Sequence, residues 1–376
     1  MAKTEEKCTM NLTSVKLHRY KMNLVTPFTT HAGTVQQREG ILVEATDSNG
    51  QSGWGEGVAF STPFYTAETV ETSWIMMKDH FLPRIKESTI HHPSDLPKIV
   101  EKEQGHQMAK AALEGALWDL YAKQQNQSLS SLIGGVQSAI PVGVVVSLSE
   151  DLNELVSYYE NQGYKRIKVK VRKGCEREDI EAVKRLSSGL SIMFDGNGAY
   201  GEEDLEHLAS LDDLGLLMIE QPFKAGDFYL HRELQRRMDT PICLDESIGS
   251  YHDAYQAIQL GSCKNMNIKI SRVGGLTEAL RINDLCEAYG VSVWCGGMLE
   301  TGISRAHNIA FASLPNITIP GDISASKRYW HEDVIIPEVE LQGGQVEVPR
   351  HIAGIGFEIN RERVSRITQE TFTYPL

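Results

Sequence analysis

The sequence lacks the features of secreted, membrane-spanning and nucleic-acid-binding proteins. Its six cysteines are scattered over 376 residues and form no C-x-x-C pair, so neither a disulfide framework nor a zinc site is indicated. No run of about 18 apolar residues could span a bilayer, and the N-terminal MAKTEEKCTM has no apolar core for a signal peptide. Positive charge is scarce too: 37 Lys and Arg stand against 50 Asp and Glu, and the net charge of −13 repels phosphate backbones. We therefore expect a soluble, cytoplasmic protein that binds neither nucleic acid nor membranes.

The first third of the chain has the pattern of an α+β unit. Residues 41–46 and 52–57 flank an Asp-Ser-Asn-Gly segment whose Asn-Gly pair is typical of a hairpin turn. Helical patterns follow over about 66–90 and 106–124. The second of these places one stripe at a spacing of four, formed by Met108, Ala112, Ala116 and Leu120.

From residue 141 onwards, short apolar runs alternate with longer helical stretches. Charged residues close five of these runs at nearly equal spacing, 25 residues three times and then 24, and they are Lys170, Asp195, Glu220, Asp245 and Lys269. Alternation of continuous apolar strands with helices indicates a buried parallel sheet, and eight such runs favour a closed barrel over a doubly wound open sheet. The expected fold class is α/β, with a TIM-type barrel.

The repeat ends near residue 335, where short strands with glycine turns follow over 341–349 and 354–362. We expect an α+β unit at 1–135, within which 1–9 is an extension. A modified barrel then occupies 136–335, and a tail at 336–376 returns to the N-terminal unit.

Three of the charged residues at the strand ends are acidic. In a parallel barrel the carboxyl ends of all strands meet at one face, so Asp195, Glu220 and Asp245 are expected to converge there. Carboxylates brought together repel one another unless a cation neutralises them, and oxygen ligands select Mg²⁺ first and Mn²⁺ next. Any one of them alone is as well explained by a helix N-cap or a salt bridge, but three at equal spacing favour a metal site.

Lysines flank these acids on both sides. Lys168 and Lys170 are two residues apart on one strand, so their side chains point to the same face. Their mutual repulsion and desolvation favour loss of a proton from one of them. A solvated surface strand is the alternative for the segment KRIKVKVRK, but the matching position of Lys269, four strands further on, favours two opposed amines.

A hard cation between opposed amines suits one type of chemistry. A metal that holds a substrate carboxylate makes the neighbouring α-proton more acidic, and one lysine can then remove it. The second lysine can return a proton to the opposite face or stabilise the anion. The residues therefore predict proton abstraction next to a carboxylate, followed by racemisation or elimination.

These motifs resemble those of the enolase superfamily, specifically its muconate-lactonising subgroup. The resemblance rests on Lys168-x-Lys170, Asp195-Gly-Asn, Glu220-Gln-Pro, Asp245-Glu-Ser and Lys269. Further segments resemble the bacterial o-succinylbenzoate synthase / N-succinylamino acid racemase family. They are PFTTHAGT (27–34), GWGEG (53–57), the P-x-Y-x-x-E of residues 63–68, IKISRVGGLTEA (268–279), WCGGMLETGISRAHN (294–308) and PGDIS (320–324).

The resemblance implies a (β/α)7β barrel with an α+β capping domain, formed by the N-terminal region and the C-terminal tail. It implies Mg²⁺ ligands at Asp195, Glu220 and Asp245, and catalytic roles for Lys168, Lys170 and Lys269. Lys170 would be the base and Lys269 the opposed lysine. The implied reactions are a dehydration in menaquinone biosynthesis and the racemisation of N-succinylamino acids.

Other positions follow from the same resemblance. Substrate contacts are expected at His31, Gly33, Thr34, Tyr65, Ser147, Asn197, Gly297 and Met298. Arg272, three residues after Lys269, is expected either to tune that lysine electrostatically or to form a salt bridge in the βα loop.

Several alternatives remain at this stage. A dedicated racemase uses the same residues, whereas a dipeptide epimerase would need an acidic pair at the eighth strand, where only Asp322 stands. Muconate cycloisomerisation and an inactive, metal-stabilised binding barrel are also possible, although the intact lysines argue against a mere binder. A His-rich hydrolase is excluded because VGVVVSL supplies no H-x-H pair. The expected partner is a small-molecule carboxylate, and we expect a homo-oligomer.

Overall fold

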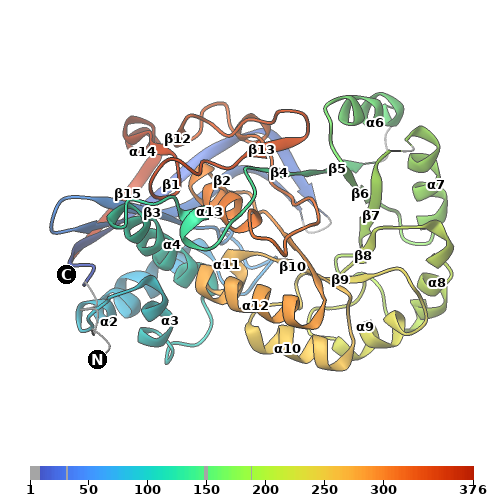
Figure 1. Ribbon diagram of the computed structural model, residues 1–376, viewed down its shortest axis with the longest axis horizontal. Coiled ribbons are helices and arrows are strands. Elements are labelled where there is room, and N and C mark those ends of the chain that lie inside the picture. The colour runs from blue at the N-terminus through green and yellow to red at the C-terminus, as the bar shows by residue number, and fades with distance from the viewer. Residues whose placement is uncertain (1–8, 31–32, 148–150, 188) are drawn as a thin grey trace.

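The computed structural model describes residues 9–30, 33–147, 151–187 and 189–376, and contains two main sheets (Figure 1). The first is antiparallel and four-stranded, in the order β15-β1-β2-β3. Its strands are β1 (Leu12–Thr30), β2 (Gly33–Asp47), β3 (Ser52–Gly57) and β15 (Thr368–Pro375). The predicted hairpin joins β2 to β3, and its turn is stabilised by the Asp47 carboxylate, which accepts hydrogen bonds from the backbone amides of Asn49 and Gln51, both at 2.9 Å.

Helices cover one face of this sheet. They are α1 (Val70–Ile75), a π-helical stretch (Met76–Phe81), α2 (Leu82–Lys86), α3 (Leu96–Ile99) and α4 (Gln107–Gln124). The predicted stripe of α4 is buried, because α4 packs directly on β3. A Cβ atom at Gly55 would lie 2.0 Å from the Ala112 carbonyl oxygen, so glycine is what permits this close approach.

The second sheet is parallel and curls into a barrel, in the order β11-β10-β9-β8-β7-β6-β5. Its strands are β5 (Gly143–Ser147), β6 (Arg166–Lys170), β7 (Ser191–Asp195), β8 (Met218–Glu220), β9 (Ile242–Leu244), β10 (Asn265–Ile268) and β11 (Ser292–Cys295). Residues 317–322 close it. Ile317 bridges to Val293 of β11, and Gly321 bridges to Val142 next to β5. The fold is therefore a TIM-type barrel with seven regular strands and an eighth, irregular segment.

Helices surround the parallel strands and shield them from solvent (Figure 1). They are α6 (Leu152–Asn161), α7 (Glu176–Leu186), α8 (Leu205–Ala209), α9 (Phe228–Gln235), α10 (Tyr251–Leu260), α12 (Leu276–Tyr289) and α13 (Gly302–Ala312). Apolar side chains from the strands and these helices form one large core, and a separate buried cluster of strand residues comprises Met193, Met218, Cys243 and Trp294. Among the described residues, no helix has the length and apolar character needed to cross a membrane.

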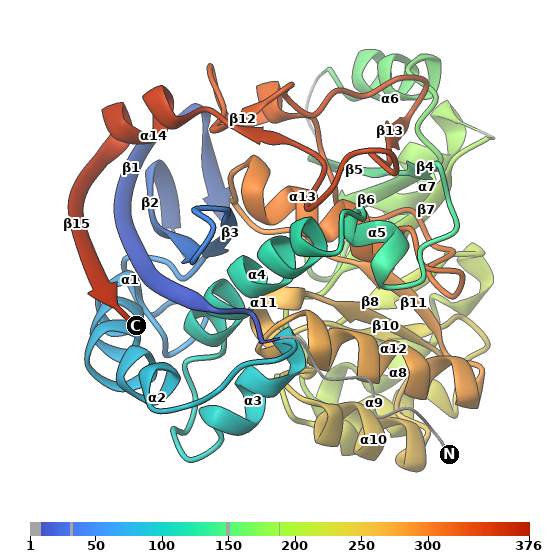
Figure 2. The same ribbon diagram turned by 60° about the vertical axis from the view of Figure 1, so that its left-hand side comes forward.

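The C-terminal segment returns to the first sheet, but not through the strands expected from the sequence. The short β13 (Gln345–Glu347) pairs with β4 (Ala139–Pro141), and β14 (Glu358–Ile359) pairs with β12 (Ile335–Ile336). The return is made instead by β15, which lies along β1 (Figure 2). Its sequence, TQETFTYP, is largely polar because β15 is an exposed edge strand, which is why hydrophobicity did not reveal it.

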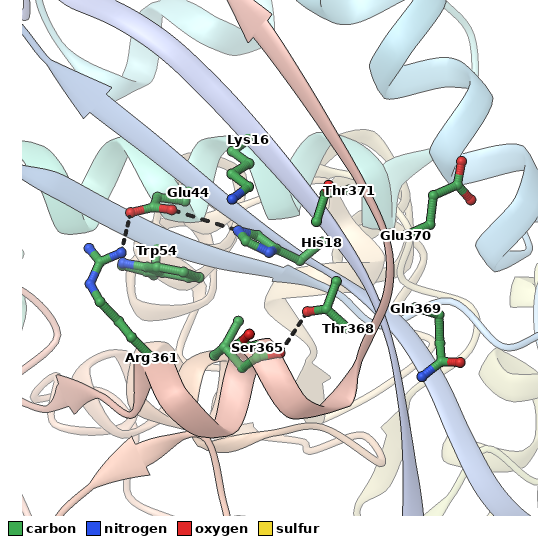
Figure 3. Close-up of a pocket in the computed structure, with 11 residues that line it drawn as sticks. Lys16, His18, Glu44, Trp54, Arg361, Ser365, Thr368, Gln369, Glu370 and Thr371 are labelled. Atoms are coloured by element: carbon green, nitrogen blue, oxygen red, sulfur yellow. Dashed lines mark hydrogen bonds and ion pairs between the residues drawn. The ribbon is translucent and has the colours of Figure 1, made fainter.

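A cavity of about 330 Å³ lies between this C-terminal segment and the first sheet (Figure 3). In it, the Glu44 carboxylate pairs with Arg361 of α14 (Arg361–Ile367) at 2.8 Å and with the His18 ring at 3.6 Å. The His18 ring stacks on Trp54, and Arg361 also lies over Trp54. Arg361 and the His18 ring thus both contact Glu44 in this cavity, and the ion pair of Arg361 with Glu44 joins α14 to the sheet.

Candidate active site

The three predicted carboxylates lie at neighbouring strand ends of the barrel. Asp195 and Glu220 are the last residues of β7 and β8 and are paired in register, and Asp245 directly follows β9. Glu220 and Asp245 are buried, and Asp195 is partly exposed. The three acids therefore lie at one face of the barrel, because parallel strands of similar length end at the same face.

The surroundings of the three acids differ. Burial, with the neighbouring charge of Glu220, raises the pKa of Asp195 well above its usual value. Burial also raises the pKa of Glu220, against the opposing charge of Lys168. Burial alone would raise the pKa of Asp245, but the charges of Arg272 and Lys269 overcome it and lower that pKa. Asp195 and Glu220 thus form a repulsive pair that an added cation would stabilise.

Amines face these acids directly. The Lys168 ammonium lies 2.9 Å from the Glu220 carboxylate and 3.6 Å from that of Asp195.

Within the described part of the chain, no three acidic, histidine or cysteine side chains are arranged as a ready metal site. The donors nevertheless suit a hard divalent cation, because all three are carboxylates and two of them repel each other.

Lys168 is buried among negative charges. Burial favours its neutral form, but the charges of Asp322, Glu220 and Asp195 overcome this and hold its pKa well above the usual value. Loss of a proton is therefore not favoured at Lys168, because the charges of these acids outweigh both burial and the repulsion from Arg166. Lys170 ends the same strand, is exposed, and is in register with Ser147 of β5.

Lys269 directly follows β10, at the start of α11 (Ile270–Val273). Its ammonium lies 2.9 Å from the Asp245 carboxylate and 3.0 Å from the Tyr65 hydroxyl. Burial favours the neutral amine, but the Asp245 charge raises the pKa of Lys269 above its usual range. Lys269 and Lys168 are therefore both cations held by carboxylates, on strands that stand four apart in the sheet.

Arg272 forms a salt bridge, which is one of the two roles expected for it. Its guanidinium pairs with Asp245 and donates a hydrogen bond to the Tyr65 hydroxyl at 3.1 Å. It also donates to the carbonyl oxygens of Asn267 and Ile248, at 3.0 and 2.9 Å. Arg272 thus forms a buried salt bridge, and the carboxylate it pairs with is the one that holds Lys269.

The other predicted contacts have different outcomes. Tyr65 lies in the segment between β3 and α1, and its hydroxyl contacts the Lys269 ammonium. Met298 packs against the same small apolar cluster as Tyr65. The Asn197 backbone donates to the Asp195 carboxylate at 3.0 Å, and its side chain reaches Glu246 at 3.4 Å. At Gly297 a Cβ atom would lie 2.6 Å from the Asp322 carbonyl oxygen.

Four predicted positions have no described side chain. His31 lies outside the described residues. Gly33 and Thr34 begin β2, where their backbones pair with Thr30 and Thr29, and Ser147 ends β5. Their roles stay predictions.

Sequence reasoning missed several charged and polar residues at this site. Arg166 belongs to the segment KRIKVKVRK, for which a solvated surface strand is the alternative prediction, yet it is fully buried and pairs with Asp322 at 2.5 Å. Its position two residues before Lys168 was the available signal, because alternation puts both side chains on one face. Asn267, whose amide donates to Glu220 at 2.9 Å, and Glu246, next to Asp245, were also missed.

Comparisons with known proteins agree with this architecture. Residues 12–134 match the mandelate racemase / muconate lactonizing enzyme N-terminal domain, and residues 150–363 match the enolase C-terminal domain-like family. A solved structure from Listeria innocua, described as a member of the enolase superfamily, superposes with a TM-score of 0.94 and 38% identity. That superposition covers 97% of this chain and 99% of the other.

Two curated relatives extend the comparison. The chain is 50% identical to an o-succinylbenzoate synthase of Geobacillus stearothermophilus, over 96% of both sequences. It is 42% identical to an N-succinylamino acid racemase of an Amycolatopsis species, over 90% of this chain and 93% of the relative. Matches of this extent leave one assignment: the chain belongs to the mandelate racemase / muconate lactonizing enzyme family of the enolase superfamily.

Proposed function

We propose that the protein is a Mg²⁺-dependent o-succinylbenzoate synthase that also racemises N-succinylamino acids. The synthase reaction is the dehydration of a succinyl-hydroxy-cyclohexadiene carboxylate precursor in menaquinone biosynthesis. A relative named o-succinylbenzoate synthase and another named N-succinylamino acid racemase support the proposal. The observation that carries it is the placement of Lys168 and Lys269 on β6 and just after β10, each paired with carboxylates from the strands between them.

Asp195, Glu220 and Asp245 would hold the cation, with Mn²⁺ as a substitute for Mg²⁺. When bound, the ion would hold the substrate carboxylate and make the adjacent α-proton more acidic. The Lys168 ammonium contacts the carboxylates of both Asp195 and Glu220. Its positive charge would help to stabilise the anion formed when the α-proton leaves.

In the dehydration, Lys170 removes the α-proton. The bond from the neighbouring carbon to its hydroxyl group then breaks, and the electron pair left by the proton forms the new carbon–carbon double bond. Lys170 gives its proton to the departing oxygen, which leaves as water. Lys269 remains a cation on the opposite side, held by Asp245 and Tyr65.

In the racemisation, Lys170 and Lys269 exchange the roles of proton acceptor and proton donor. One lysine takes the α-proton from one face, and the other donates a proton to the opposite face. His31, Gly33, Thr34, Ser147, Asn197, Gly297 and Met298 would line the substrate pocket, and Tyr65 would shield it. The proposed enzyme works in the cytoplasm on a small-molecule carboxylate, as a homo-oligomer that binds neither nucleic acid nor membranes.

The test is a comparison of kcat/KM for the synthase substrate with kcat/KM for a panel of N-succinylamino acids, in deuterated solvent. We expect dehydration of the first, and deuterium at the α-position of the second together with loss of optical activity. Dehydration without deuterium incorporation would restrict the protein to the synthase reaction, and the reverse would make it a dedicated racemase. Absence of turnover with both substrate classes would refute the proposal.

A further inference from the structure

Arg166 is a buried cation that the mechanism above does not use. It begins β6, two residues before Lys168, and its side chain has no exposed surface. The guanidinium donates to the Pro320 carbonyl oxygen at 2.8 Å and lies 5.0 Å from the centre of the Trp294 ring. Burying an arginine costs free energy unless an opposite charge pairs with it, so the role of Arg166 depends on the carboxylate that pairs with it.

The space for Arg166 is built into the neighbouring strand. Gly143 of β5 is in register with Arg166, and a Cβ atom there would lie 2.2 Å from the guanidinium carbon. Any larger residue would displace the guanidinium. The position of the charge is therefore fixed by a glycine on one side and by an aromatic ring on another.

The partner of Arg166 is Asp322, in the segment that closes the barrel. One Asp322 oxygen accepts from Arg166 at 2.5 Å, and the other accepts from Lys168 at 2.8 Å. Burial alone would raise the pKa of Asp322, but the charges of Lys168 and Arg166 lower it below its usual range. Asp322 is thus an ionised carboxylate with both oxygens occupied by cations, although a fifth of its side chain, 21%, remains exposed.

This pairing changes the charge that a substrate meets. Without Arg166, Asp322 would share Lys168 with Glu220 and Asp195 and would be under-compensated. An exposed, under-compensated carboxylate attracts an ammonium group. With Arg166 present that attraction is cancelled, and a divalent cation bound under the proposed function would leave the site with excess positive charge.

We propose that Arg166 is a positioning residue that sets the charge preference of the site: by neutralising Asp322, it makes the site select substrates with an anionic arm over those with an ammonium group. The inference rests on the proposed function and deepens it. Under that function, it gives a physical reason for the site to accept substrates with an anionic succinyl arm.

The test uses two compounds that differ only in the charge of the arm. A succinyl-amino acid and the corresponding β-alanyl-amino acid have acyl arms of equal length, ending in a carboxylate and an ammonium group. The amino acid is the one that the wild-type enzyme racemises fastest. For each compound, kcat/KM is measured from α-deuteration, and binding to the Mg²⁺-loaded protein is measured by calorimetry.

We expect the wild type to prefer the succinyl compound by about 100-fold or more. Arg166→Met, which keeps apolar packing against Trp294, should lower this ratio about tenfold or more, because Asp322 becomes available. Arg166→Lys should retain the preference. The double variant Arg166→Met/Asp322→Asn should recover it, because the released carboxylate is removed.

Arg166→Gln serves as a second variant if Arg166→Met does not fold, because it keeps a hydrogen-bond donor but loses the charge. A folded Arg166→Met or Arg166→Gln protein with the wild-type ratio, in kinetics and in binding, would overturn the inference. So would a lowered ratio that persists in the double variant. Failure of the proposed function is distinguishable, because it would show in the wild type as absent turnover of both substrate classes.

Discussion

Two lysines of similar burial are held by different partners in this active site. Lys168 contacts three carboxylates, whereas Lys269 contacts Asp245 and the hydroxyl of Tyr65. A lysine among several acids remains a cation and is suited to stabilise an anion. Lys170, at the exposed end of β6, is in the better position to meet a substrate entering from solvent.

At the scale of single residues, we predict that Lys170→Ala and Lys269→Ala each lower racemisation about 1,000-fold or more, because each removes one of the two proton carriers. Circular dichroism and thermal unfolding should show a folded protein in both cases. Lys173→Ala is the matched control, since Lys173 is exposed and pairs with Asp204 away from the site. Normal racemisation in either site variant would contradict the two-lysine assignment.

At the scale of secondary-structure elements, a buried carboxylate helps to join the antiparallel sheet to the barrel. Glu56 of β3 accepts hydrogen bonds from the Tyr20 hydroxyl at 2.7 Å and from the Thr301 hydroxyl at 2.8 Å. It also accepts from the backbone amides of Thr301 and Ser304, at the start of α13. A carboxylate at a helix N-terminus is further favoured by the helix dipole. This contact holds β3 against the start of α13, and Tyr65, in the segment that follows β3, contacts Lys269.

Glu56→Gln should therefore destabilise the protein by about 1–3 kcal/mol, because an amide cannot accept all of these bonds with both of its terminal atoms. The free energy of unfolding is measured by denaturant titration. Glu347→Gln provides the control, since Glu347 is exposed on β13 and should leave stability unchanged. Equal stability of Glu56→Gln and the wild type would show that the junction depends on apolar packing instead.

At the scale of the whole molecule, the repulsion between Asp195 and Glu220 couples metal binding to stability. Because a divalent cation binds the folded carboxylates and not the unfolded chain, the melting temperature should rise as the Mg²⁺ concentration increases. At a concentration of 100 times the Kd, the free energy of unfolding should increase by about 2.7 kcal/mol. EDTA should abolish activity, and Mg²⁺ or Mn²⁺, but not Zn²⁺ alone, should restore it.

The control for metal binding is Asp195→Asn, which removes one proposed ligand and relieves the repulsion. It should be at least as stable as the metal-free wild type, because an amide in place of this partly exposed carboxylate removes a like charge near Glu220. Its melting temperature should no longer respond to Mg²⁺. Full activity of the EDTA-treated wild type would rule out the metal-dependent mechanism.

The sequence by itself determined the barrel and the positions of its principal charged residues. Both depend on local regularity: strands and helices alternate at a nearly constant spacing, and parallel strands end at one face. Asp195, Glu220, Asp245 and Lys269 could therefore be placed at strand ends without knowing any contact between them.

Only the tertiary structure decided which charges meet. Arg166 and Asp322 are 156 residues apart, and their contact exists because residues 317–322 close the barrel next to β5. The protonated state of Lys168 likewise depends on acids contributed by three other segments. Pairing of buried charges follows from distances across the whole fold, and those distances are not encoded in any local pattern.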